Sequence, residues 1–530
     1  MEIYRNCRII TMDGEMSNGD YMAVDSGRIV EVGTGIIKPE YEGAKQVDLN
    51  GSVVIPGFWE SHLHIATGMR SLMELNLKDC GNYKQLKDRV YAYCKKIAPG
   101  DWVIGHGWDE KKLFGGKFPD RLVLDELCNS HPMVLVRMDG HSLCVNTAAI
   151  EHLGLQGLES SAEAPQGGDG KPSGMFFENT ATDILASIEC LFPDNYIEKV
   201  ILSAQDLFFK NGITSVNDIS IQYGRYLELY RKLGAEGKLK LRITASPNGA
   251  DEDLVEEFEM NKSNQNERLK IGPPKYFMDG SFGSRTGLLW EEYTDDPGNI
   301  GLQLIEEDEL EAIIDSNAAK GIPINIHAIG DRAVSIILDA FDKLKGANKR
   351  GLRCRIEHIQ IIKDEDIERF KQNSITASFQ PVFLYEVDLT QSRLGKERLP
   401  RVYRIKSFID QGINVVLNSD WPYGGEVFPE KTDGTRYIGF EPILGIHAAC
   451  CKQMNESESV TPDQALQCYT VNPAYVNCRE KELGKLKKGY LADFAVLSVD
   501  ITEVAAEEIL STEVLATYIS GKKVYEKKNL

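Results

Sequence analysis

Short apolar segments rich in β-branched residues alternate with longer amphipathic segments over most of the chain. This alternation is typical of βα units and predicts a parallel sheet covered by helices. The predicted strands are VVIPGFWESH from residue 53, GITSVNDI from 212, KLRITAS from 240, KYFMDG from 275, IPINIHAIG from 322, CRIEHIQ from 354, ITASFQP from 375 and NVVLNSD from 414. Eight such strands predict an α/β fold with a closed (β/α)8 TIM barrel, which we assign to residues 56–65 and 200–480.

The first two predicted strands are separated by far more chain than the roughly thirty residues that one βαβ unit needs. This stretch holds a helical pattern, YKQLKDRVYAYCKKIA, an apolar strand-like PMVLVRM and a loop rich in Gly and Pro, APQGGDGKPSG. Residues 66–199 are therefore predicted to form an inserted domain. Because it leaves the barrel at a β→α junction, where barrel enzymes keep their active sites, we expect it to cover the site as a lid.

Both ends of the chain have a different texture, with short strand-like pieces separated by Gly and Asp-Gly turns. CRIITMDG and YMAVDSGRIVEVG near the start resemble in this respect LGKLKKGYLADFAVL and EVLATYISGKKVYE near the end, and all of them predict hairpins. Chain ends often lie close together in a domain. We therefore expect residues 1–55 and 481–530 to combine into one composite β-sandwich.

Composition narrows the functional classes. The chain has 530 residues, 42% of them hydrophobic, and a formal net charge of -20, which disfavours nucleic acid and anionic membranes as partners. No apolar run approaches the length of a membrane span, and the start lacks the pattern of a signal peptide. The eleven cysteines are scattered without any C-x-x-C spacing. These features predict a soluble, cytoplasmic protein with reduced thiols.

Candidate metal ligands cluster at the ends of predicted strands. His62 and His64 in GFWESHLH lie two residues apart, so in a strand both side chains point to the same face and can bind one ion. H-x-H alone is weak evidence, but His327, His358 and Asp420 end three other predicted strands. Four strand ends that converge on one barrel mouth predict a metal site there.

Each of the later three residues also has an ordinary structural interpretation. His327 alone would be a hydrogen-bonded core histidine, His358 alone would pair with the neighbouring Glu357, and Asp420 alone would cap a helix or a turn. The joint occurrence of all three with H-x-H favours the metal site.

Several longer motifs match a known family. They are KYFMDGSFGSRTGLL from residue 275, HAIGDRAV from 327, RIEHIQ, SDWP, VTPDQALQCYTVNPAY and LGKLKKGYLADFAVL, with GHGWDE and RMDGHSLCVN in the predicted insert. Together with the strand-end histidines and aspartate, they make the chain resemble the amidohydrolase superfamily of metal-dependent hydrolases. Within it, the chain is most similar to the amidohydrolase family 3 branch that includes N-substituted formamide deformylases, and the likeness spans nearly the whole chain.

The resemblance implies a ligand set and a metal. It implies Zn²⁺, with Fe or Mn as alternatives that fit the same ligands, bound as one or two ions. The implied metal ligands are His62, His64, Lys275, His327, His358 and Asp420. In two-metal members a carboxylated lysine bridges the ions, and Lys275 matches it; without carboxylation, a single ion on His62, His64, His327 and Asp420 is the alternative. Glu60 stands where the family usually has Asp, and we expect it to orient a ligand histidine.

The predicted insert and one loop supply further candidates for substrate contacts. Two polar motifs of the insert offer His106, Trp108, Asp109, Arg137, Asp139, His141 and Asn146. His141 is favoured because DGH directly follows a predicted strand, although hydrogen bonding within the insert explains each residue equally well. Arg285 in the Gly-rich DGSFGSR would bind an anionic group, and an ordinary flexible loop is the alternative.

The resemblance implies hydrolysis of a carbon–nitrogen bond other than a peptide bond, in an amide-like small molecule such as an N-formyl or N-acyl compound. Asp420 would be the general base and acid, as in the family, and His141 would stabilise the oxyanion. A deaminase or cyclic-amide hydrolase on the same site is one alternative, and a non-catalytic small-molecule-binding regulatory protein is another. We expect no nucleic-acid or membrane partner, and a homodimer stays open.

Overall fold

The eight predicted strands are all present and follow one another in the predicted order. The computed structural model describes residues 1–98, 100–221, 224–249, 267–344, 351–423, 428–431 and 433–528. The eight strands are β5 (Phe58–Leu63), β11 (Ile213–Ile221), β12 (Arg242–Pro247), β14 (Lys275–Phe277), β15 (Asn325–Ala328), β16 (Arg355–His358), β17 (Thr376–Phe379) and β18 (Val415–Leu417). A short strand that we did not predict, β13 (Leu269–Ile271), pairs with β12.

These strands form two parallel sheets, which we call the central sheets, with the orders β13-β12-β11-β5 and β14-β15-β16-β17-β18. Single parallel bridges join them at two seams, Leu63 with Trp421 and Asn248 with Lys275. The strands are thus arranged as two bridged sheets instead of the one continuous ladder that we expected. At one seam, Pro273 and Pro274 precede β14 and have no N–H to donate.

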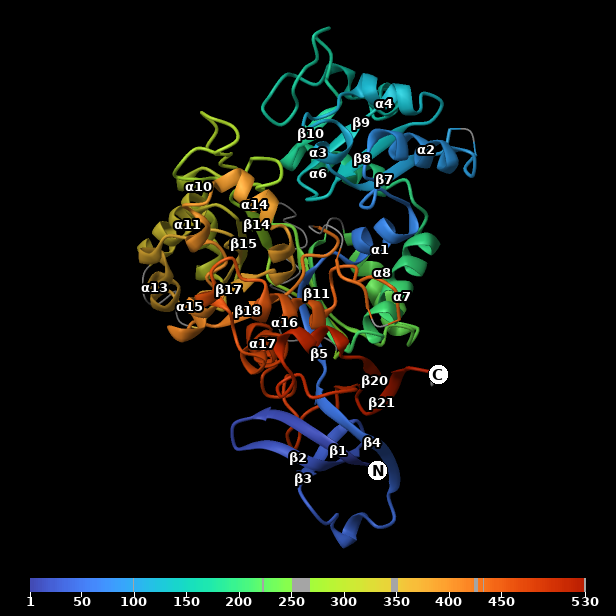
Figure 1. Ribbon diagram of the computed structural model, residues 1–530, viewed down its shortest axis with the longest axis vertical. Helices are drawn as coiled ribbons and strands as arrows, with labels where there is room; N and C mark the ends of the chain where they lie inside the picture. The colour runs from blue at the N-terminus through green and yellow to red at the C-terminus, as the bar shows by residue number, and fades with distance from the viewer. Residues whose placement is uncertain are drawn as a thin grey trace.

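Helices cover the outside of the central sheets (Figure 1). In α11 (Asp331–Lys343), Val334, Ile337 and Phe341 recur at helical spacing and are buried. The other helices of this part are α7 (Asp194–Phe209), α8 (Gly224–Ala235), α10 (Glu307–Ala319), α13 (Asp364–Gln372), α14 (Val387–Leu394), α15 (Ile405–Asp410), α16 (Pro442–Cys451), α17 (Pro462–Cys468) and α18 (Val471–Val476). Short 3-10 turns cover Pro381–Tyr385, Leu399–Arg401 and Glu456–Glu458.

An inserted domain follows β5 and lies beyond one end of the central sheets (Figure 1). Its sheet has the order β10-β9-β8-β7-β6. The strands are β6 (Leu75–Asn76), β7 (Val103–Trp108), β8 (Met133–Arg137), β9 (Ser142–Val145) and β10 (Met175–Phe177). Its helices are α1 (Ile65–Met73), α2 (Tyr83–Cys94), α3 (Glu110–Leu113), α4 (Arg121–Leu127), α5 (Thr147–His152) and α6 (Glu178–Glu189), with a 3-10 turn at Leu155–Gly157. Separate apolar clusters on the insert sheet give this domain a core of its own.

The two ends of the chain share one seven-stranded sheet at the opposite end of the molecule (Figure 1). Its order is β21-β20-β19-β4-β1-β2-β3, and β19 lies antiparallel to β4. The strands are β1 (Glu2–Asp13), β2 (Met16–Asp25), β3 (Arg28–Gly33), β4 (Lys45–Pro56), β19 (Phe494–Leu497), β20 (Val514–Ile519) and β21 (Lys522–Glu526), with 3-10 turns at Pro39–Tyr41 and Ala506–Ser511. The strands from both termini therefore lie in one sheet and not in two facing sheets.

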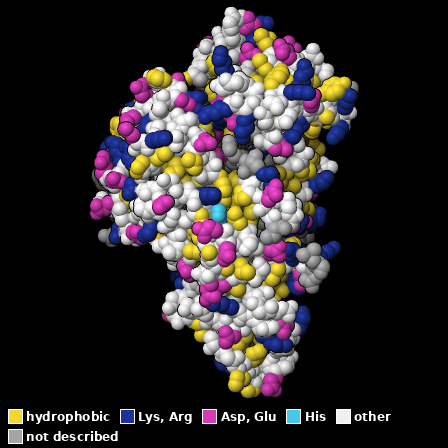
Figure 2. Space-filling view, viewed as in Figure 1, with side chains coloured by type: hydrophobic (Ala, Val, Ile, Leu, Met, Phe, Trp, Pro, Cys, Tyr) yellow, Lys and Arg dark blue, Asp and Glu magenta, His cyan; other side chains and the backbone are white. Residues whose placement is uncertain are grey.

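The charged side chains on the surface are consistent with the composition of the sequence. Acidic and basic side chains are interspersed over the face shown in Figure 2, and the described residues of that face form no continuous basic patch. None of the described helices is long and apolar enough to cross a bilayer. All eleven cysteines are free thiols.

Candidate metal centre

A cavity of about 360 Å³ lies between the central sheets and the insert. All six predicted metal ligands line it, and each comes from a different strand or strand end except the two in GFWESHLH. They are His62 and His64 at the end of β5, Lys275 in β14, His327 in β15, His358 at the end of β16 and Asp420 after β18. Parallel strands end at one edge, so residues far apart in sequence meet here. The convergence predicted from the strand ends is therefore observed.

His62, His64 and Asp420 form the tightest cluster. One potential ligand atom from each lies within 4.8 Å of the other two. The Asp420 Oδ1 atom lies 3.2 Å from His62 Nε2 and 3.1 Å from His64 Nε2. Burial disfavours the Asp420 carboxylate, but His62, His64 and His358 hold its pKa well below the usual range. Two imidazole nitrogens and one carboxylate oxygen in such proximity fit a divalent metal of the zinc type.

His327 and His358 extend this cluster along the central sheets. Their rings lie 4.3 Å apart, and the ring of His62 lies 5.2 Å from that of His358. Burial lowers the pKa of both, that of His358 to about 3. The neutral imidazole is the form that binds metal, so burial prepares both rings for this role. His358 Nδ1 lies 2.8 Å from Gln380 Oε1.

Lys275 is buried almost completely, as His62 is. It begins β14, pairs with Asn325 in the next strand, and its side chain is buried. Its ammonium nitrogen lies 5.0 Å from the centre of the Phe277 ring and forms no ion pair or hydrogen bond with the residues that the structure describes. Burial lowers the pKa of Lys275 to about 8. With this pKa a substantial fraction of Lys275 is the neutral amine, which is the form that carboxylation requires.

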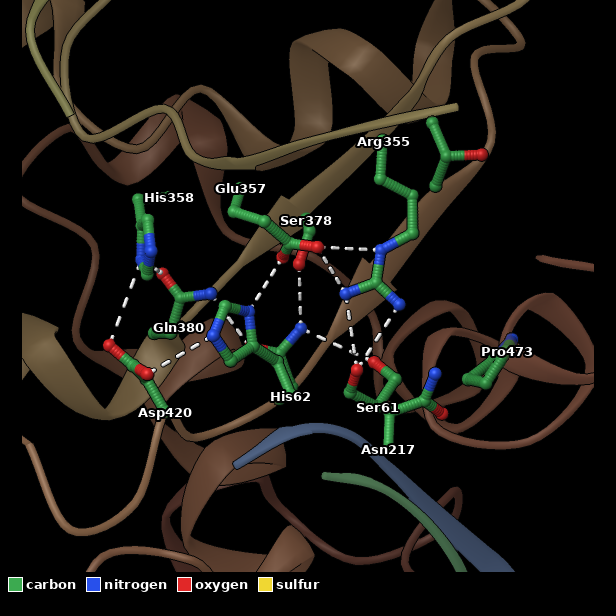
Figure 3. Close-up of polar contacts among 12 residues, drawn as sticks. Ser61, His62, Asn217, Arg355, Glu357, His358, Ser378, Gln380, Asp420 and Pro473 are labelled. Carbon is green, nitrogen blue, oxygen red and sulfur yellow. Dashed lines mark hydrogen bonds and ion pairs between the residues drawn. The ribbon is translucent and has the colours of Figure 1, made fainter. Parts of the chain in front are cut away.

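A buried ion-pair network orients His62, and sequence reasoning missed it (Figure 3). His62 Nδ1 lies 2.8 Å from Glu357 Oε2, and the Arg355 Nε–H donates to Glu357 Oε1 at 2.7 Å. Arg355 also donates to the Ser61 carbonyl. Burial opposes the ionised Glu357, but Arg355 and His62 hold its pKa well below the usual range. Such a carboxylate fixes the tautomer and direction of a ligand histidine.

The interpretation of Glu357 as a partner of His358 is therefore wrong, because its carboxylate contacts His62 on the neighbouring strand. Gln380 fills the place next to His358 instead. The sequence did hold a signal for Gln380, since it lies near the end of the predicted strand ITASFQP, but a glutamine there is a weak indication of a metal site.

Glu60 has another role than the one expected. Its Oε1 accepts the backbone N–H groups of His62 at 3.2 Å and Ser419 at 3.1 Å, and neither contact reaches a histidine ring. Burial raises the pKa of Glu60 well above its usual range. The side chain thus links the end of β5 to the segment after β18, which positions the backbone on both sides of the cluster.

Three of the seven candidate residues in the insert reach the cavity, namely His106, Asp139 and His141. His106 Nε2 lies 2.8 Å from Glu74 Oε2, and Asp139 Oδ2 accepts from Ser281 at 2.6 Å and Ser284 at 2.8 Å. The ring of His141 lies 5.0 Å from that of His327, one of the predicted ligands. The insert therefore supplies polar groups that face the predicted ligands.

The other four candidates form hydrogen bonds and ion pairs within the insert. Trp108 donates from Nε1 to the Leu135 carbonyl, and Asp109 caps α3. Arg137 forms ion pairs with Glu110 and Asp139. Asn146 caps α5 and donates to two backbone carbonyls.

Arg285, which we predicted to bind an anionic group, lies outside the lining of the cavity. Its guanidinium forms a two-point ion pair with Asp295, with N–O distances of 3.2 and 3.0 Å. Asp295 therefore pairs with the guanidinium that we expected to bind an anion. Within the same loop, Ser281 and Ser284 reach the site indirectly, through Asp139.

His141 has a charged partner that the sequence did not indicate. His141 Nδ1 lies 2.6 Å from Oε2 of Glu178, the first residue of α6. Burial opposes the imidazolium, but Glu178 and Asp139 together raise the pKa of His141 to about 9. The pKa of His141 therefore lies above neutral pH, whereas burial lowers the pKa values of His327 and His358 on the central sheets.

Comparison with known proteins agrees with this site. The family model described as the amidohydrolase family matches residues 45–525. The chain belongs to the amidohydrolase family. It is 26% identical to the N-substituted formamide deformylase of Arthrobacter pascens, over 98% of each chain. It is 29% identical to the protein LONG AFTER FAR-RED 3 of Arabidopsis thaliana, over 98% of this chain and 91% of that one.

A solved structure gives the same result. An uncharacterized metal-dependent hydrolase from Pyrococcus furiosus superposes with a TM-score of 0.74, at 28% identity, over 95% of this chain and 100% of the other. Membership of this family of metal-dependent hydrolases thus rests on agreement over nearly the full length. The resemblance found in the sequence is confirmed.

Proposed function

We propose that this amidohydrolase cleaves the carbon–nitrogen bond of an amide-like small molecule, such as an N-formyl or N-acyl compound, and that Zn²⁺ is its metal. The convergence of His62, His64 and Asp420 within 4.8 Å carries the proposal. Fe and Mn are the alternatives that the same ligands accept. The bridged central sheets act as one (β/α)8 barrel in this proposal, and the insert acts as the lid over its mouth.

His62, His64, His327, His358 and Asp420 would hold the metal, and Lys275, once carboxylated, would be a further ligand. The burial and the lowered pKa of Lys275 support this modification. A bound divalent ion supplies Lewis-acid chemistry, which promotes ionisation of water and polarises a carbonyl group.

Two side chains of the cavity then transfer protons and stabilise negative charge. Asp420, ionised and next to two imidazoles, accepts the proton of the attacking water and passes it to the leaving nitrogen. His141 faces the cluster from the insert and donates a charged hydrogen bond to the oxygen that becomes negative in the transition state. The two groups approach the substrate from opposite walls, since Asp420 belongs to the central part and His141 to the insert.

The test combines metal analysis of the purified protein with a panel of N-formyl, N-acyl and cyclic amides and amino-substituted heterocycles. Release of amine from an open-chain amide, lost on chelation and restored by Zn²⁺, supports the proposal. Ammonia from a heterocycle would identify a deaminase, and ring opening a cyclic-amide hydrolase. Asp420→Asn should abolish turnover. Ligand binding that survives both chelation and Asp420→Asn, with no product from any compound, would instead indicate a regulatory binding protein.

A further inference from the structure

Two cysteines of the insert face each other at the ends of two helices. Cys94 is the last residue of α2, and Cys128 directly follows α4. Their sulfur atoms lie 3.4 Å apart. Cys128 belongs to the apolar cluster of the insert that also contains Leu86, Val90 and Leu124, and the partly buried Cys94 packs against this cluster. The pair lies outside the metal cluster, and none of the functions assigned above uses it.

The backbone around Cys128 is held firmly. The Cys128 N–H donates to the Leu124 carbonyl at 3.0 Å, and the Cys128 carbonyl accepts from Asn146 Nδ2 at 2.8 Å. Bonded sulfurs are about 2.05 Å apart, so the two atoms must approach by only about 1.4 Å. Rotation of one cysteine side chain accounts for a change of this size.

We propose that Cys94 and Cys128 form a reversible disulfide when the folded protein meets an oxidised low-molecular-weight disulfide. The Cys94 thiolate attacks the small disulfide, giving a mixed disulfide and one released thiolate. The Cys128 thiolate then attacks the Cys94 sulfur and releases the second. In sum, two protein thiols and one small disulfide give one protein disulfide and two small thiols, so electrons and protons balance.

Accessibility decides the order of these two steps. Cys94 is partly exposed and Cys128 is buried, so the reagent reaches Cys94 first. Burial, reinforced by contact with Cys128, raises the pKa of the Cys94 thiol to about 12. Because the thiolate is the nucleophile, the exchange is slow at neutral pH and accelerates as pH rises. This behaviour fits a crosslink that responds to sustained oxidation and not a rapid catalytic dithiol.

The crosslink would stabilise the insert. It closes the segment 94–128, which contains β7 with the cavity residue His106, and it ties α2 to α4 on one face of the insert sheet. A bond between residues this far apart in sequence restricts the unfolded chain and so favours the folded insert. The effect does not depend on the metal or on the proposed reaction.

The experiment exposes the full-length folded protein to oxidised glutathione, alkylates the remaining thiols and maps peptides without reduction. We expect the peptides of Cys94 and Cys128 joined to each other, with the loss of two hydrogen atoms. The exposed Cys190 and Cys478 should carry alkyl groups or glutathione. The link should form faster at pH 9 than at pH 7, disappear on reduction, and raise the temperature of thermal unfolding while it is present.

Three variants make the result decisive. Cys94→Ser and Cys128→Ser should each abolish the link and the rise in unfolding temperature, whereas Cys190→Ser, the matched control at an exposed thiol, should leave both unchanged. The proposal is overturned if both thiols stay alkylatable after Cys190 has reacted fully. A link that forms only in denaturant, or one that joins other cysteines in the folded protein, would overturn it equally.

Discussion

Glu178 contacts His141 at two points. Its backbone N–H donates to the His141 carbonyl at 2.9 Å, and its Oε2 atom lies 2.6 Å from His141 Nδ1. Glu178 has a φ of 45°, in the left-handed region that non-glycine residues seldom occupy. When a residue at a cavity keeps an unfavourable backbone conformation, the position of its side chain matters more than the local stability that the conformation costs. Here that position is the one that fixes the ring and the charge of His141.

Glu178→Gln should lower kcat about 10-fold to 100-fold with little change in KM, because His141 loses the charge that keeps it protonated. Without that charge, burial lowers the pKa of His141 from about 9. Activity that needs the imidazolium is retained below this pKa and lost as pH rises through it. The alkaline decline in kcat should therefore move to lower pH than in the wild type.

Asp183→Asn is the matched control, since Asp183 lies on the same helix and lines the same cavity but is exposed. It should leave both kcat and its pH profile unchanged. If the pH profile of Glu178→Gln coincides with that of the wild type, Glu178 has only a structural role.

Glu357→Gln should weaken metal binding about 10-fold to 100-fold. The amide fills the same space but no longer gives His62 a charged acceptor, and it leaves Arg355 without its ion-pair partner. Competition with a chromogenic chelator measures the affinity directly.

Glu60→Gln is the comparison at an equally buried carboxyl group that contacts the backbone of His62 and not its ring. We expect its metal affinity to stay within about 3-fold of the wild type, well below the roughly 10-fold to 100-fold loss that removal of a ligand's partner produces. Equal losses in the two variants would show that general destabilisation, and not ring orientation, governs the metal affinity.

The cluster of potential metal ligands could be predicted from the sequence because strand ends in a parallel sheet share one edge. The order of the strands alone was enough to predict that His62, His327 and Asp420 lie close together. The periodicity of a strand also gave the shared face of His62 and His64, since alternate side chains point the same way.

The partners of these residues could not be predicted in the same way. Glu357 contacts His62 from a neighbouring strand, and Glu178 contacts His141 from the start of α6, so both pairings depend on distances in space. For Arg285 the sequence offered a cation in a loop, but Asp295, ten residues later, takes up its charge. An ion pair within a loop produces no regular pattern of hydrophobic and polar positions, so the sequence does not indicate it.

Arg285→Ala should leave kcat and KM within about 2-fold of the wild type, because surface ion pairs contribute on the order of 1 kcal/mol or less. Asp295 keeps a second partner in Arg393, so its charge is not stranded. Steady-state kinetics on any amide that the protein turns over provides the measurement. A large rise in KM for anionic substrates alone would restore Arg285 as an anion-binding residue.

Asp218 should make stability depend on pH. It is buried at the cavity wall, where its carboxyl group accepts from Tyr230 Oη at 2.5 Å and from the Ile65 N–H at 2.9 Å. Burial outweighs these bonds and raises its pKa to about 6, against 3.8 for the ordinary value. The folded protein thus binds a proton between these values that the unfolded chain has already lost.

The sign follows from this difference. The stability that the protonated Asp218 contributes is fully present below pH 3.8 and is lost as pH rises through about 6. The wild type should therefore lose up to about 3 kcal/mol of unfolding free energy between acid and neutral pH, relative to Asp218→Asn, whose amide does not titrate. Denaturant unfolding of both proteins from pH 4.5 to 8 measures the difference. A gap that does not change with pH would contradict the raised pKa, and Asp183→Asn should follow the wild-type curve throughout.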